Sequence, residues 1–162
     1  MPTSAHIIPP IIDVQQACEC SLPVSQETLI HWASLPLSSE TPIELTLRLV
    51  TRDEIQHLNH SYRKLDKPTN VLAFPSQIPD TIPQEVQFLG DVIICPSILD
   101  EEAEVLQRSK PAHWAHIIIH GILHLMGYDH HEPEETHLMQ SLEIQFLASL
   151  GFENPYSSSE PG

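Results

Sequence analysis

Two histidines stand four residues apart inside a long apolar stretch near the C-terminal end of the chain. The segment 120–130 reads HGILHLMGYDH, and its flank 117–119 reads III. If this stretch is helical, one turn sets the rings of His120 and His124 on one face, with Cβ atoms roughly 5–6 Å apart. Ring nitrogens at that spacing can bind one divalent cation, so the pair is a candidate for two metal ligands.

A third histidine follows where the helix is expected to end. Gly127 can adopt positive φ at low cost, which favours a left-handed exit from the helix and lets the chain turn back with His130. Three protein nitrogens leave a fourth coordination position for water, and an open position distinguishes catalytic zinc sites from structural ones. The pattern therefore predicts a metal-activated hydrolase.

One other histidine competes for a place in this set. The chain contains 11 histidines, and His116 stands four residues before His120 at the same spacing. The apolar neighbours indicate a buried helix, where each imidazole needs a polar partner. His116 lies one turn further from the loop that carries His130. We therefore expect His120, His124 and His130 to be the ligands, with His116 as the reserve candidate.

The same offsets match a known peptidase pattern, with one difference. His120, His124, Gly127 and His130 fit the long zincin pattern H-E-x-x-H-x-x-G-x-x-H. Gly121 occupies the position at which those enzymes carry the glutamate that serves as general base. Peptide hydrolysis would then need another proton acceptor, so we rank a peptidase below other hydrolytic chemistry.

Length and composition favour one acidic domain. We expect a single domain over residues 1–155 and a disordered tail over 156–162. Seven Lys and Arg against 22 Asp and Glu give a formal net charge of −15, which argues against coating nucleic acid through bulk electrostatics. Five of the basic residues nevertheless fall within residues 48–67, so a local cationic groove remains compatible with the sequence.

Cysteine content and hydropathy point to the cytoplasm. The three cysteines, Cys18, Cys20 and Cys95, fit ordinary thiols in a reducing compartment and not a disulfide framework. No segment approaches the roughly 18 uninterrupted apolar residues of a membrane span. We expect a cytoplasmic protein without a membrane partner.

The elements that must position these histidines give an α+β chain. Expected strands cover 11–14, 43–50, 71–74 and 88–95, and expected helices cover 25–35, 51–62, 97–108, a helix from Pro111 and one from Pro133. In the last helix the expected buried stripe is Leu138, Leu142, Phe146 and Leu150. The order predicts a small mixed sheet of about four strands covered by helices. The metal site is expected on a central C-terminal helix and its following loop.

The chain resembles the YbeY family of bacterial endoribonucleases. The segment 120–130 is similar to the family motif H-G-x-L-H-L-x-G-Y-D-H, and further similarities follow in matching order upstream. These are Leu58-Asn59 with Tyr62-Arg63, the segment TNVLAFP at 69–75, and GDVII at 90–94. Ala73 departs from the family, which usually carries serine there, and an altered substrate contact would follow if that hydroxyl binds RNA.

The resemblance implies a zinc-dependent, single-strand-specific endoribonuclease of ribosomal RNA processing. It implies maturation of the small-subunit rRNA 3′ end, ribosome quality control, and the ribosome or its small subunit as partner. His120, His124 and His130 are then the ligands of one Zn²⁺, although imidazole also suits other divalent metals. Arg63 is then an active-site cation.

Two further points concern the residues around this site. Arg63 can hold a phosphate through two parallel hydrogen bonds, whereas Lys64 and Lys67 are candidate RNA-binding point charges. Asp129 either orients a ligand imidazole or forms a local turn, and the sequence does not decide between these roles.

Two alternative functions remain. One is a ribosome-assembly or RNA-binding factor with a structural metal, and the other is a zincin-like metallopeptidase.

Overall fold

The structure is a computed structural model that describes residues 8–37, 41–78 and 85–156. In chain order the elements are β1 (Ile11–Gln16), α1 (Gln26–Ser34), β2 (Ile43–Leu49), α2 (Arg52–Arg63), β3 (Val71–Pro75), β4 (Gln87–Ile94), α3 (Pro96–Val105), α4 (Lys110–Leu125) and α5 (Pro133–Ser149). This succession confirms the predicted α+β class. The expected tail at 157–162 lies outside the described residues.

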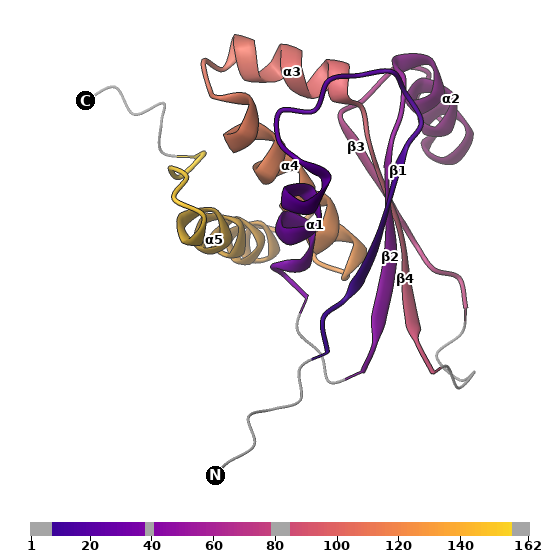
Figure 1. Ribbon diagram of the computed structural model, residues 1–162, viewed down its shortest axis with the longest axis vertical. Helices are drawn as coiled ribbons and strands as arrows, with labels where there is room; N and C mark the ends of the chain where they lie inside the picture. The colour runs from indigo at the N-terminus through magenta and orange to yellow at the C-terminus, as the bar shows by residue number, and fades with distance from the viewer. Residues whose placement is uncertain (1–7, 38–40, 79–84, 157–162) are drawn as a thin grey trace.

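The four strands form one open mixed sheet in the order β1-β2-β4-β3. The pairs β1–β2 and β2–β4 are parallel, whereas β3 runs antiparallel to β4 and ends the sheet on one side. Helix α2 covers one face of the sheet, and α1 and α4 lie on the other (Figure 1). The predicted small mixed sheet covered by helices is confirmed.

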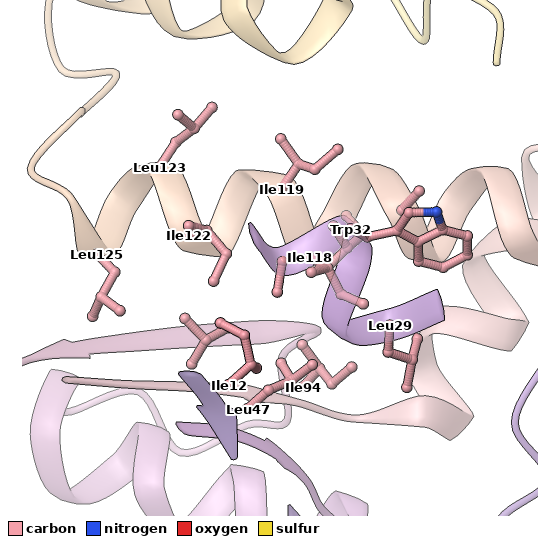
Figure 2. Close-up of a cluster of buried hydrophobic side chains, with 14 of the residues drawn as sticks. Ile12, Leu29, Trp32, Leu47, Ile94, Ile118, Ile119, Ile122, Leu123 and Leu125 are labelled. Carbon is pink, nitrogen blue, oxygen red and sulfur yellow. The ribbon is translucent and has the colours of Figure 1, made fainter. Parts of the chain in front are cut away.

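Helix α4 is apolar on nearly every side because it lies between the sheet and α5. Ile118, Ile122 and Leu125 point toward the strands that carry Ile12 and Leu47 (Figure 2), and all five are buried. Ile119 and Leu123 point the opposite way, toward α5 (Figure 2). A helix buried on two sides fits the nearly continuous isoleucine and leucine run of its sequence.

Three helix boundaries, in α3 and α4, differ from the prediction. The predicted start of α3 at residue 97 was wrong by one residue, because α3 begins at Pro96, whose fixed φ suits a first helical position. Ser97 Oγ accepts a hydrogen bond of 3.2 Å from Arg52 Nε. Helix α3 also ends at Val105 and not near Arg108. Helix α4 begins one residue before Pro111, with Ser109 as its cap.

The buried face of α5 is not the predicted one. Met139, Glu143 and Leu147 are the buried residues of this helix, whereas Leu138 is 51% exposed. Leu142, Phe146 and Leu150 pack against the core only partly. A strict four-residue repeat drifts around a helix of 3.6 residues per turn, so the predicted stripe and the true contact face are offset.

Tyr156, the first residue of the predicted tail, is held in place. Its hydroxyl donates a hydrogen bond to the buried carboxylate of Glu143 and lies 3.1 Å from His116 Nε2. Tyr156 therefore packs with the folded part of the chain, and the boundary after residue 155 stays a prediction. Within the described part of the chain, no helix combines the length and apolar character needed to cross a membrane.

Candidate metal centre

The structure brings His120, His124 and His130 together at the C-terminal end of α4. One ring nitrogen from each of the three lies within 4.8 Å of the other two, and within the described ranges no other group of acidic, histidine or cysteine residues meets that criterion. The ring centroids are 4.7 Å apart for His120 and His124, and 4.9 Å apart for His124 and His130. This convergence is what a single ion requires.

The turn after α4 carries His130 back to the helix. Gly127 has φ +106°, and Tyr128 N donates to Leu123 O at 3.0 Å, which closes the helix end. The residue before His130 then holds its backbone, because Asp129 Oδ1 accepts from His130 N at 2.7 Å. Thr136, near the start of α5, donates a hydrogen bond of 3.1 Å from Oγ1 to His130 O. His130 is thus fixed from both sides.

Asp129 therefore acts mainly on the backbone of the turn. Its hydrogen bond from His130 N lowers the pKa of the carboxyl, and its second oxygen lies 3.1 Å from His131 Nε2. Of the two roles that the sequence allowed, the local turn is the one closer to this geometry.

A buried carboxylate on α5 orients the first ligand. His120 Nδ1 donates to Glu143 Oε2 at 2.5 Å, and the Glu143 side chain has no exposed surface. Occupation of Nδ1 leaves Nε2 of His120 as the atom available to a metal, an arrangement common in zinc sites. Burial alone would raise the pKa of Glu143, but hydrogen bonds from His116, His120 and Tyr156 outweigh it and lower the pKa to about 2. The carboxylate is therefore charged.

The residues present fit a divalent metal. The donor set is three imidazole nitrogens, one of them backed by a carboxylate, and three protein ligands leave an open coordination position. Burial, together with repulsion from His120 and His130, lowers the pKa of His124 to about 4. His124 therefore stays neutral, the form that binds metal, well into acid.

The reserve candidate His116 does not belong to this cluster. Its Nδ1 lies 3.3 Å from Arg108 Nη1, and its Nε2 lies 3.3 Å from Glu143 Oε1. Its neighbour His113 is buried, with Nδ1 at 3.1 Å from the same Arg108 nitrogen and Nε2 at 2.9 Å from Glu102 Oε1. Both ring nitrogens of each histidine have protein partners, so these two imidazoles are structural.

The triad opens into a groove with a volume of about 610 Å³. The groove follows β3 and is also lined by the end of α2 and by the turn that carries His130. Its lining residues are Tyr62, Arg63, Thr69, Asn70, Val71, Leu72, Ala73, Phe74, Pro75, His120, Gly121, His124, Asp129, His130 and His131. The groove thus contains Arg63 together with all three histidines, although they come from separate parts of the chain.

Arg63 reaches the groove because it is the last residue of α2. Lys64 ends this helix in the left-handed conformation, with φ 63°, and its N–H bonds back to His60 O at 3.1 Å. Asn59 Nδ2 donates to Lys67 O at 2.9 Å, which holds the following loop against the helix. Lys64 and Lys67 are exposed and are not among the described residues that line the groove.

Helix α4 packs tightly against the sheet at Gly121. A Cβ built on Gly121 would lie 2.8 Å from Val92 Cγ1 and 3.0 Å from Val71 Cγ2. The position at which zincin peptidases carry their glutamate therefore faces packed valine side chains and leaves no room for a longer side chain. A second position of interest, Ala73, is partly buried in the groove wall, at the position where the resemblance led us to expect serine.

Sequence reasoning missed two residues of this site, Glu143 and Tyr156. Glu143 falls in register with Met139 and Leu147, so the correct stripe on α5 would have shown an acidic residue on a buried face. A carboxylate at such a position needs a buried partner and would have pointed to a histidine. Tyr156 gives no comparable signal, because its contact with Glu143 depends on how the chain folds back after α5.

Known proteins are similar to this chain over most of its length. The family model described as endoribonuclease YbeY matches residues 15–151. Endoribonuclease YbeY proteins from the Corby and Lens strains of Legionella pneumophila are each 49% identical to this chain, over 92% of the chain and 95% of their own length. The solution structure of TM1509 from Thermotoga maritima superposes with a TM-score of 0.51 at 26% identity, covering 94% of this chain and 99% of that one.

Fold and site together define an α+β protein with an open three-histidine centre of the hydrolase type. The family model and the relatives match most of the chain, and this extent identifies its family. The chain belongs to the endoribonuclease YbeY family, as its motifs indicated.

Proposed function

We propose that this protein is a zinc-dependent endoribonuclease that cleaves single-stranded RNA. Its proposed role is in ribosomal RNA processing in the cytoplasm, at the 3′ end of small-subunit rRNA and in ribosome quality control, with the ribosome or its small subunit as partner. The observation that carries the proposal is the open three-histidine centre, which shares one groove with Arg63 in a chain of this family. We also propose that residues 1–155 act as one domain.

Each site residue has a role in this proposal. His120, His124 and His130 would hold one Zn²⁺, or another divalent metal, and Glu143 would fix the tautomer and orientation of His120. Such an ion, when bound, supplies a water of lowered pKa and a positive charge beside a phosphate. Arg63 would hold a phosphate oxygen with its guanidinium, as the negative charge of the group increases during cleavage.

The test is cleavage by the purified protein with its metal content measured in the same preparation. Metal-loaded wild type should cut single-stranded RNA and leave a fully paired RNA of the same sequence intact. Chelation should abolish cleavage, and added zinc should restore it. Arg63→Lys keeps the charge but loses the paired hydrogen bonds, so it should retain metal and cut more slowly.

Two outcomes would reject the proposal. Wild type that carries metal but cuts no RNA would favour an assembly factor whose metal is structural. Cleavage of a casein-like substrate would favour a peptidase, which the packing of Gly121 against the sheet disfavours.

A further inference from the structure

An exposed aromatic side chain lies at the edge of the groove. Tyr62 is 66% exposed, although it precedes Arg63 at the end of α2 and lines the groove. Its ring centroid is 4.8 Å from that of Phe74, with 53° between the planes. Phe74 is half-buried and packs on the small core under α2, which gives Tyr62 a fixed apolar support. An aromatic ring held in this way at the edge of a groove offers a flat face on which a base can stack.

Strand β3 separates the aromatic pair of Tyr62 and Phe74 from the histidines, which lie on the other side of its edge. Phe74 and Leu72 pack with the core under α2, whereas Val71 and Ala73 pack toward α4. Since β3 is the last strand of the sheet, its outer edge is open to the groove. The groove therefore passes around this edge, from Tyr62 at the end of α2 to the histidines at the end of α4.

Backbone groups of β3 face the same groove. Cys95 N donates to Asn70 O at 3.1 Å, and Ser76 N donates to Leu89 O at 2.8 Å. In an antiparallel pair, residues that bond to the partner strand alternate with residues that do not. The peptide groups of Val71 and Ala73 are therefore directed to the open edge, between the aromatic pair and the histidines.

The charge of the protein adds a constraint. The chain carries 22 acidic and seven basic residues, and Arg63 is the one Lys or Arg among the described residues that line the groove. Apart from a bound metal, the groove thus offers a polyanion one side-chain cation, and a contact to another part of the nucleotide would add affinity. Stacking on an aromatic ring is available to every base and depends little on charge.

We propose that Tyr62, supported by Phe74, stacks one unpaired nucleobase of the RNA beside the cleavage site. This inference rests on the proposed function and assigns to it a substrate contact. The bases of a duplex are already stacked and paired, so they cannot lie on Tyr62 without being unstacked. The aromatic pair then contributes to the preference for single strands without reading sequence.

The test is a cycle that combines protein variants with abasic substrates. The substrate is a single-stranded RNA with one cleavage site, prepared as a series in which each copy lacks the base at one position near that site. Tyr62→Ala should raise KM on the intact RNA about tenfold, within the range expected for loss of one stacked base, and change kcat less. In wild type, one abasic position should raise KM by a similar factor.

The decisive readout is the combination of the two changes. At the position whose base stacks on Tyr62, the KM of the Tyr62→Ala variant should be nearly the same for abasic and intact RNA, because the variant has already lost the contact. Tyr62→Phe should behave as wild type, since the ring is retained. Leu65→Ala is the matched control, because Leu65 is exposed on the next loop and is not among the described residues that line the groove.

The possible failures are distinguishable. If wild type cuts RNA but Tyr62→Ala leaves KM unchanged, the stacking contact is rejected and the proposed function stands. The same holds if the increases in KM caused by the variant and by the missing base multiply at every position. If metal-loaded wild type cuts no single-stranded RNA, both are rejected.

Discussion

Two regions of α4 carry histidines at related spacings, but only one of them is open. In the first region, His113 and His116 have protein partners on both ring nitrogens, supplied by Arg108, Glu102 and Glu143. In the second region, His120 has one nitrogen bonded to Glu143, and its ring faces those of His124 and His130. His116–His120 and His120–His124 are equally spaced in sequence. The partners supplied by α3, by the connection from α3 to α4, by α5 and by the C-terminal segment therefore decide which histidines can bind metal.

Glu143 connects the two regions. One of its carboxylate oxygens bonds to His116 and the other to His120. In the closed region the carboxylate completes a network that holds α3, α4 and the C-terminal segment together through Glu102, Arg108 and Tyr156. In the open region the same carboxylate orients a ligand. A structural network and a reactive centre thus share one buried charge.

The largest expected difference in metal retention and RNA cleavage is between two variants, each of which replaces one histidine from one of the two regions. His124→Ala should abolish metal retention and reduce RNA cleavage by more than about 100-fold, since loss of a supporting residue alone typically costs up to that factor. His116→Gln should keep its metal and most of its activity. Metal content after dialysis and cleavage rates on single-stranded RNA provide the measurement. Equal metal loss in both variants would contradict the division of α4 into two regions.

The shared carboxylate should have the next largest effect. Glu143→Gln keeps the size of the side chain but removes the charge behind His120, so zinc affinity should fall about 10- to 100-fold. Competition with a chromophoric chelator measures this affinity. Glu102→Gln changes the carboxylate that bonds to His113 in the closed region and should leave zinc affinity unchanged. Similar losses in both variants would mean that the effect on metal is indirect.

A third variant tests the side of α4 that faces the sheet. Gly121→Ala should destabilise the protein by about 1–3 kcal/mol, because its methyl group meets two valines whose χ1 angles are restricted. This is the expected net change in the free energy of unfolding, after the gain of about 1 kcal/mol that alanine brings to a helix interior. Urea unfolding measures the change. Val92→Ala in the same chain should recover part of it, and an unchanged free energy of unfolding in Gly121→Ala would contradict the close packing.

The smallest expected effect is a pH dependence of the metal-free protein. The pKa of His124 is about 4 in the folded chain, whereas an unfolded histidine titrates near 6.5. Between these values the unfolded chain binds a proton that the folded chain does not. The free energy of unfolding therefore falls as the pH drops from about 6.5 to about 4, by about 1 kcal/mol after allowance for partial exposure.

Urea unfolding of metal-free protein at several pH values between 7 and 4 measures this dependence. His124→Ala is the control and should show a flatter profile over the same range. A wild-type profile as flat as that of the variant would contradict the lowered pKa of His124.

Much of the fold followed from local patterns in the sequence. The strand predicted over 43–50 is β2, and its leucines alternate with less buried residues and are fully buried. Thr51, the first residue of the helix predicted over 51–62, caps α2, with its hydroxyl accepting from Glu54 N at 3.2 Å. The three histidines were also predicted to meet, because helical spacing places the first two and Gly127 turns the chain toward the third. All of these signals act over a few residues.

The parts that were missed depend on contacts between distant segments. The bond from His120 to Glu143 joins residues 23 apart, and the contact of Tyr156 with His116 joins residues 40 apart. Nothing in local periodicity marks such pairs. The packing reason for Gly121 was also missed, because a missing glutamate was visible in the sequence but the two valines behind it were not.

The free edge of β3 has a consequence for how this protein behaves among copies of itself. An unpaired strand edge can recruit another chain and extend the sheet from one molecule into the next. Here the edge strand is only five residues long and ends at Pro75, which has no N–H to offer. The molecule can therefore leave this edge accessible to a ligand with little risk of self-association.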